Sequence, residues 1–142
     1  MLIMIVDDNN AHIRAVSTLF KAYFAQNKIH ADIAPFTNPE VDDWLNLPGT
    51  ANTSNIICLL DLKFDTISSN KSGFDTIKLL RSHRKTKDIY ILACTGNTIS
   101  EEDCIALGFN GCVRKPVTID KLIGIIEGYY RHYGELNVTD IR

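Results

Sequence analysis

Polar side chains that could act on a phosphoryl group follow four short apolar runs of the chain. In chain order these side chains belong to Asp7 and Asp8, to Asp61, to Thr95, and to Lys115, which Pro116 follows. Carboxylate oxygens are the ligands that Mg²⁺ prefers, and a carboxylate can also attack phosphorus and form an aspartyl-phosphate. A lysine can hold a phosphoryl oxygen as a mobile point charge. Together these groups predict a site for a divalent cation and a phosphoryl group.

The apolar runs are typical of strands that are buried on both faces of a parallel sheet, because such strands read as continuous hydrophobic segments. We expect strands over Leu2 to Val6, Ala31 to Phe36, Ile56 to Leu60, Ile89 to Cys94 and Gly111 to Arg114. Ligands of open parallel sheets bind outside the carboxyl ends of the strands. The four signals are therefore expected to converge at one edge of the sheet, where three carboxylates repel one another unless a cation is present.

Segments with helical periodicity alternate with these strands. Helices are expected after Asn9 and Asn10, after Asn38 and Pro39, from Gly73, from Ser100 to Gly108, and after Thr118, the last with Tyr129 and Tyr130 among its apolar residues. Five βα units imply right-handed crossovers. The predicted fold class is α/β, with a doubly wound five-stranded parallel sheet in a three-layer α/β/α arrangement.

Length and charge narrow the class of protein. The chain has 142 residues, and residues 1–133 are expected to form one domain and residues 134–142 a C-terminal tail. Its net charge of −2 does not support nucleic-acid binding. No apolar run reaches the roughly 20 residues that span a membrane, and the first residues lack the basic region of a signal peptide. We expect a cytoplasmic protein that binds neither nucleic acid nor membranes.

The cysteines and histidines give weaker signals. Cys58, Cys94, Cys104 and Cys112 lie in apolar or helical stretches and form no C-x-x-C pair. They are expected to be buried thiols in a reducing compartment, with a metal or disulfide role as the alternative. The four histidines, which are His12, His30, His83 and His132, are scattered and are expected to be solvated or packed.

Each polar signal taken alone has an ordinary explanation. Asp7 and Asp8 could form a turn and a helix cap, Asp61 could end a strand, and Thr95 with Gly96 could form a turn. The joint pattern, with every signal at a strand end and all in one order, favours a functional site. With these residues in this order, the chain resembles the receiver domain of two-component response regulators, a family that includes chemotaxis regulators. The resemblance covers roughly residues 1–133.

The resemblance implies the strand order 2-1-3-4-5 of the flavodoxin-like fold and a role for each matching residue. It implies that Asp61 is the phosphoacceptor. It implies that Asp7, Asp8 and Asp61 bind Mg²⁺ or Mn²⁺ together with the carbonyl of Lys63. It implies that Thr95 is the switch hydroxyl, that Lys115 binds the phosphoryl group, and that the bond from Lys115 to Pro116 is often cis.

The sequence departs from the family pattern in three places. The segment after Asp61 lacks the usual Met-Pro, and the loop there is about four residues longer than usual, an insertion that costs little free energy. Cys112 stands where the family has an aromatic residue, three positions before Lys115. No output domain is expected after residue 133.

The resemblance implies a single-domain response regulator rather than an enzyme with a substrate of its own. It would be a phosphoprotein of a phosphorelay that accepts phosphate on Asp61 from a sensor histidine kinase or a histidine phosphotransfer protein. It would act on a downstream protein target, with a homodimer on phosphorylation as one outcome. The alternative is a phosphorylation-independent pseudo-receiver that uses the fold as a binding module. An aspartyl hydrolase is rejected because Lys63 stands where its second carboxylate would be.

Overall fold

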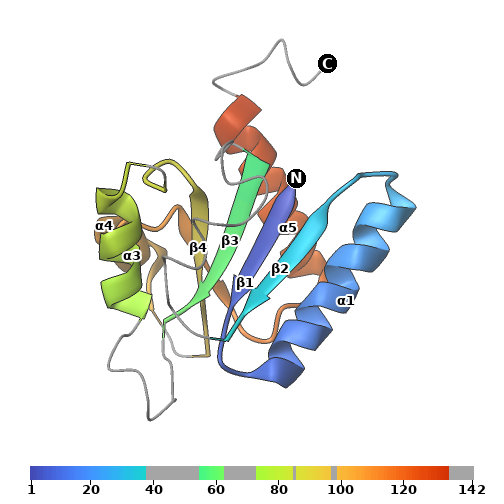
Figure 1. Ribbon diagram of the computed structural model, residues 1–142, viewed down its shortest axis with the longest axis horizontal. Coiled ribbons are helices and arrows are strands. Elements are labelled where there is room, and N and C mark those ends of the chain that lie inside the picture. The colour runs from blue at the N-terminus through green and yellow to red at the C-terminus, as the bar shows by residue number, and fades with distance from the viewer. Residues whose placement is uncertain (38–54, 63–72, 85, 97–98, 135–142) are drawn as a thin grey trace.

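The computed structural model describes residues 1–37, 55–62, 73–84, 86–96 and 99–134, and these form a parallel sheet flanked by helices (Figure 1). The strands are β1 (Leu2–Val6), β2 (Asp32–Phe36), β3 (Ile56–Asp61), β4 (Tyr90–Thr95) and β5 (Gly111–Arg114). They pair in the order β2-β1-β3-β4-β5, every pair being parallel. The predicted fold class and strand order are confirmed.

The register of the sheet brings the predicted polar residues to one edge. Val6 is level with Phe36 and Leu60, Asp61 with Cys94, and Thr95 with Arg114. The residues that end the strands or follow them therefore share the carboxyl edge of the sheet, as predicted. β3 and β4 each run one residue further than expected. Thr95 stays in the ladder because its carbonyl oxygen accepts a hydrogen bond from the backbone N–H of Lys115 at 2.8 Å.

Local signals in the sequence set the helix ends. The described helices are α1 (Asn10–Gln26), α3 (Gly73–Ser82), α4 (Glu101–Leu107) and α5 (Ile119–Gly134). The Asn9 side chain caps α1 by accepting from the backbone N–H of His12, and Ser100 caps α4 in the same way from Asp103. Gly108 ends α4 with a left-handed φ of 111°, a conformation that glycine adopts at little cost. The helix ends predicted at Asn9, Ser100 and Gly108 are confirmed.

Alternating side chains of the strands fill two separate cores, one on each face of the sheet. α1 and α5 cover the first core, where Phe20, Leu59 and Leu122 are fully buried or nearly so. α3 and α4 cover the second, with Leu60 and Ile77 at its centre. Figure 1 shows the helices on the two sides of the sheet, so the predicted three layers are confirmed. Every core strand is covered on both faces, which explains its continuous apolar sequence.

Two expectations have other outcomes. Tyr130 is 39% exposed, whereas Tyr129, one position earlier on α5, is buried in the first core. The prediction that Tyr130 belongs to the buried apolar face is therefore wrong. The helix expected after Asn38 and Pro39 lies outside the described residues.

The last described helix, α5, extends to Gly134. Among the described residues, no helix is long and apolar enough to cross a membrane.

The guanidinium of Arg81, near the end of α3, joins four separate parts of the fold. Its Nε donates to the carbonyl of Gly108 at 2.7 Å. Its Nη1 donates to the carbonyls of Lys87 at 2.8 Å and Ile89 at 2.7 Å, and its Nη2 donates to the side chain of Asn110 at 2.8 Å. The Asn110 amide oxygen also accepts from the backbone N–H of Ile91 at 2.8 Å. Arg81 therefore fixes the end of α4 relative to β4 and to the start of β5.

The Arg81 contacts predict the effect of a charge-preserving substitution. Arg81→Lys keeps the charge but cannot reproduce the forked donors, so it should lower the free energy of unfolding by roughly 2–4 kcal/mol. Arg84→Lys is the matched control, because Arg84 is an exposed arginine that lies two residues after the end of α3. Urea unfolding at neutral pH measures both. Equal stability of the two variants would show that the hydrogen bonds of the Arg81 guanidinium contribute nothing beyond its charge.

Candidate functional site

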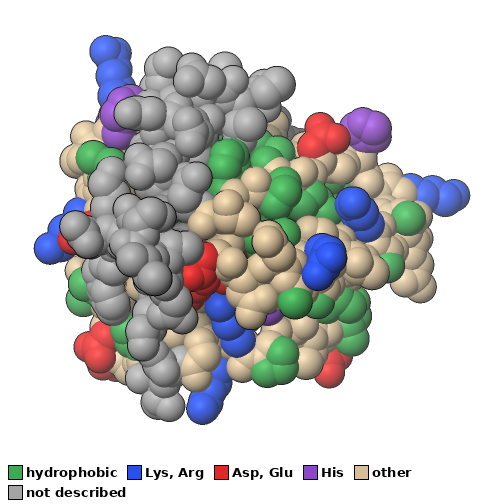
Figure 2. All heavy atoms as spheres, turned by 60° about the horizontal axis from the view of Figure 1, so that its bottom comes forward, with side chains coloured by type: hydrophobic (Ala, Val, Ile, Leu, Met, Phe, Trp, Pro, Cys, Tyr) green, Lys and Arg blue, Asp and Glu red, His purple; other side chains and the backbone are tan. Residues whose placement is uncertain are grey.

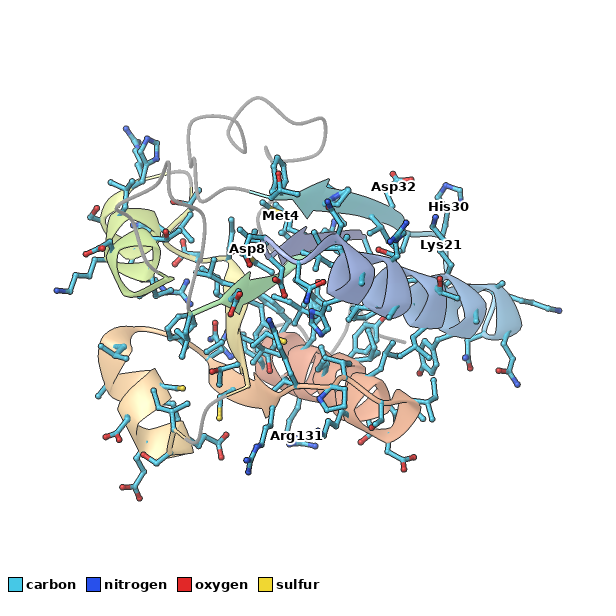
Figure 3. All side chains as sticks on the ribbon, turned by 90° about the horizontal axis from the view of Figure 1, so that it is seen from below. Met4, Asp8, Lys21, His30, Asp32 and Arg131 are labelled. Carbon is cyan, nitrogen blue, oxygen red and sulfur yellow. The ribbon has the colours of Figure 1, made fainter. Side chains whose placement is uncertain are left out.

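Three carboxylates meet at the carboxyl edge of the sheet. Asp7 and Asp8 follow β1 directly, and Asp61 is the last residue of β3. One oxygen from each of the three side chains lies within 4.8 Å of the others. Asp7 and Asp61 are buried, at 2% and 5% exposure, and Asp8 is partly exposed. Figure 3 looks at this edge directly and places Asp8 over the middle of the sheet.

Lys115 lies between two of these carboxylates. Its Nζ is 2.8 Å from Oδ2 of Asp7 and 3.4 Å from Oδ2 of Asp61. The backbone of Lys115 is tied to Thr95 at the end of β4, and its bond to Pro116 is cis, as the resemblance implies. Figure 2 shows acidic and basic side chains next to each other near the middle of this edge. The lysine therefore supplies part of the positive charge that the cluster needs.

The proximity of Lys115 and the carboxylates changes the pKa of the lysine. Burial by itself lowers the pKa of Lys115, but the hydrogen bond to Asp7 and the charges of Asp61 and Asp7 outweigh it, so the pKa is raised above its usual value. The ammonium is therefore charged throughout the physiological pH range. It remains available as a cation for an anionic group that approaches Asp61.

His12 also contacts the Asp7 carboxylate, and no pattern in the sequence predicts this contact. Nδ1 of His12 is 2.8 Å from Oδ2 of Asp7, and Oδ1 of Asp7 accepts from the backbone N–H of Asn9 at 2.9 Å. Nε2 of His12 is buried and has no hydrogen-bond partner among the described residues. His12 is packed, as one of the two expectations has it, and its contact with Asp7 is an addition that the sequence does not predict. His12 lies in the first turn of α1, which begins close to the end of β1. This position is the signal that could have indicated the contact.

The contacts of Asp7 keep its carboxyl group ionised. Burial by itself raises the pKa of Asp7, but hydrogen bonds from His12, Lys115 and the Asn9 backbone, together with the charge of Lys115, lower it from 3.8 to about 2. Asp7 is thus a carboxylate at neutral pH. An ionised, buried carboxylate with fixed geometry is a suitable ligand for a hard cation.

The charge and the atoms of the cluster fit a divalent cation. Among the described residues, the three carboxylates carry more negative charge than the ammonium of Lys115 offsets. All three acidic side chains offer oxygen, which Mg²⁺ and Mn²⁺ prefer. Asp7, Asp8 and Asp61 are therefore the residues that would hold such an ion. The carbonyl of Lys63, the fourth ligand that the resemblance implies, lies outside the described residues.

Thr95 completes the set that the structure brings to this edge. It is the last residue of β4, is buried at 4% exposure, and is linked to Lys115 through its carbonyl group. Asp7, Asp8, Asp61, Thr95 and Lys115 thus all lie where the sequence predicts. Their chemical roles, and that of Lys63, stay predictions.

Comparison with solved structures identifies proteins with the same fold, although no family model matches the chain. The signal receiver domain of the DNA-binding response regulator merR from Colwellia psychrerythraea is 21% identical, with a TM-score of 0.72 over 92% of this chain and 98% of that chain. The chemotaxis response regulator CheY4 of Vibrio cholerae is 17% identical, with a TM-score of 0.70 over 90% and 97%. A CheY-like receiver domain protein from Methanospirillum hungatei is 15% identical, with a TM-score of 0.68 over 94% and 96%. The chain therefore has the fold of response-regulator receiver domains.

The lowered pKa of Asp7 predicts how stability depends on pH when a chelator removes divalent cations. A carboxyl group whose pKa is lowered on folding stabilises the fold above its unfolded pKa, and this contribution is lost as the pH falls through the folded value. A folded pKa of about 2 against 3.8 therefore corresponds to about 2 kcal/mol, lost between about pH 4 and pH 2. Asp7→Asn should flatten the pH profile over this window by that amount.

The exposed Asp32, at the start of β2, provides the matched control, because Figure 3 shows it far from Asp8. Asp32→Asn should keep the profile of the native chain in denaturant unfolding measured from pH 5 to pH 2. A profile that Asp7→Asn leaves unchanged would mean that the contacts of Asp7 with His12 and Lys115 do not stabilise its charge in solution.

Proposed function

We propose that the protein is the receiver domain of a two-component system and is phosphorylated on Asp61. The observation that carries the proposal is the position of Lys115, whose ammonium reaches Asp61 within a cluster of three carboxylates. The receiver-domain fold supports it, because that fold places the cluster at the edge of the sheet where ligands bind. A nucleophile, a cation site and a mobile positive charge are what phosphoryl transfer to a carboxylate requires.

In this proposal, Asp61 attacks the phosphorus atom of a phosphohistidine partner. An Asp61 oxygen forms the new P–O bond while the P–N bond to the partner's imidazole breaks, and the imidazole takes up a proton. Asp7, Asp8 and Asp61 would hold a Mg²⁺ ion, which would supply positive charge to the phosphoryl oxygens. Lys115 turns from Asp7 toward a phosphoryl oxygen, which is a short movement because its Nζ already lies 3.4 Å from Asp61. Thr95 offers a hydroxyl to another oxygen from the end of β4.

His12 has a positioning role in this scheme. When Lys115 moves to the phosphoryl group, Asp7 loses one of its hydrogen bonds, and the bonds from His12 and the Asn9 backbone remain. These two contacts come from the start of α1, so they fix the Asp7 carboxylate relative to the sheet while the lysine moves. Asp7 therefore keeps its orientation toward the cation in both states.

The partners follow from the chemistry of the site. A sensor histidine kinase or a histidine phosphotransfer protein would supply the phosphoryl group, and a downstream protein would recognise the altered surface. The chain would catalyse only its own phosphorylation and dephosphorylation. A pseudo-receiver remains the alternative, and it would bind partners without the phosphoryl step.

Phosphorylation by a small donor tests the proposal. Incubation with acetyl phosphate and Mg²⁺ should add about 80 Da to the intact mass of the native chain, the mass of one phosphoryl group. Asp61→Asn should abolish the gain, because an amide is not a nucleophile toward phosphorus. Chelation of the cation should reduce the rate of the gain by at least tenfold.

Asp32→Asn serves as the control, since it removes an exposed carboxylate remote from the site. It should gain mass at the native rate. A native chain that gains no mass would leave the pseudo-receiver as the function, and labelling that persists in Asp61→Asn would move the phosphoacceptor to another residue.

A further inference from the structure

Two of the cysteines lie together on one face of the sheet. Cys104 is on α4 and is fully buried in the second core. Cys112 is on β5, is partly buried, and packs against the same core. The two side chains are neighbours, because α4 packs on β5 and both residues belong to the same core. The Cys112 thiol also contributes to raising the pKa of Cys104. The pair is separate from the carboxylate cluster and takes no part in the proposed phosphoryl transfer.

The register of the sheet explains why these two thiols meet and the others do not. Cys112 is level with Ala93, and Cys94 with Val113. Cys94 therefore points into the first core, on the opposite face. Cys58 shares the face of Cys112 but lies on β3, two strands from β5, which is about 10 Å across the sheet. Among the cysteines, all of which the structure describes, Cys104 is the partner within reach of Cys112.

A groove gives small molecules access to Cys112. It has a volume of about 620 Å³, and it runs along the outer edge of β5 between α4 and α5. Gly124 and Gly128 of α5 line it, together with Cys112 itself, and Figure 3 shows Arg131 on the side of α5 nearer α4. A Cβ atom at Gly124 would meet no atom within 4 Å, so the groove is open there. An oxidant in the groove can therefore reach Cys112, whereas Cys104 is fully buried and does not line the groove.

From this placement we infer that Cys104 and Cys112 form a dithiol that a hydroperoxide oxidises to a disulfide, which ties α4 to the edge strand β5. In the first step the Cys112 thiolate attacks the peroxide, an S–O bond forms, the O–O bond breaks, and the departing oxygen leaves as water or alcohol. In the second, the Cys104 sulfur attacks the Cys112 sulfenic acid, an S–S bond forms, and the S–O bond breaks. The Cys104 proton leaves with the oxygen as water. Two thiols lose two electrons in total, and the peroxide gains them.

The surroundings of the thiols set this order of steps. Burial, together with the neighbouring Cys112 thiol and the acidic residues Asp103 and Glu101, raises the pKa of Cys104 to about 11. Cys104 is therefore a poor first nucleophile at neutral pH, but its contact with Cys112 gives it a high effective concentration in the second step. Burial raises the pKa of Cys58 and of Cys94 to about 12, so neither thiol is readily deprotonated at neutral pH.

The disulfide would act on the part of the fold that follows Thr95. α4 begins six residues after Thr95, and β5 ends one residue before Lys115. A covalent bond between α4 and β5 restricts movement of α4 relative to the sheet. The oxidised chain is thus expected to hold α4 in one position whatever the state of Asp61.

Intact mass after oxidation tests the inference. The native chain, fully reduced and then treated with one equivalent of hydrogen peroxide, should lose about 2 Da and two of its four alkylatable thiols. Peptide mapping should join the peptides that contain Cys104 and Cys112. Cys112→Ser should abolish the loss, and Cys58→Ala, a change on the same face, should keep it. Mapping of the native chain decides the question even if a variant fails to fold.

Other outcomes would overturn the inference. In the intact mass, they are no change at a tenfold excess of peroxide, or a gain of about 32 Da from sulfinic acid at Cys112. In the peptide map, they are a disulfide that involves Cys58 or Cys94, or a disulfide between two chains. Amide exchange then tests the tether, because exchange in α4 should slow severalfold in the oxidised chain while exchange in α1 stays constant. Equal exchange in α4 before and after oxidation would refute the tether. None of these results depends on phosphorylation of Asp61.

Discussion

The contact of one ammonium with two buried carboxylates is the interaction on which the site depends. Asp7 and Asp61 lie at the ends of neighbouring strands, so the sheet itself forces their charges together. Repulsion in a partly buried place is costly unless a positive charge is present, and Lys115 supplies that charge at 2.8 and 3.4 Å. Lys115 therefore offsets only part of the negative charge of the three carboxylates. The charge that remains on the described residues fits a divalent cation.

The rest of the fold places these charges and keeps them in register. The parallel ladder aligns the ends of β1, β3, β4 and β5, and the Thr95 carbonyl fixes the backbone of Lys115. His12 and the Asn9 backbone hold Asp7 from the start of α1. On the other side of the molecule, Arg81 joins the end of α4 to β4 and β5. The site and the α4–β5 region are therefore held by hydrogen bonds to the same sheet.

The sequence was sufficient to predict the sheet, the helix caps and the convergence of the polar residues, because each depends on local patterns. Continuous apolar runs indicate buried parallel strands, and Asn9, Ser100 and Gly108 signal helix ends directly. Contacts between residues distant in sequence were not predictable in this way. The forked contacts of Arg81 and the meeting of Cys104 with Cys112 depend on how α3 and α4 pack on the sheet. The contact of His12 with Asp7 is short in sequence, but a single histidine after a helix cap has many ordinary explanations.

In this account Lys115 and a divalent cation supply positive charge to the same three carboxylates. The most direct measurement is the gain in free energy of unfolding on adding Mg²⁺, compared between the native chain and Lys115→Met, with the exposed Lys21→Met as control. A ligand that binds the folded state stabilises it in proportion to RT ln(1 + [L]/Kd). Without the competing ammonium, Lys115→Met should start less stable and gain more from Mg²⁺, by about 1 kcal/mol or more. Equal gains in all three chains would contradict the claim.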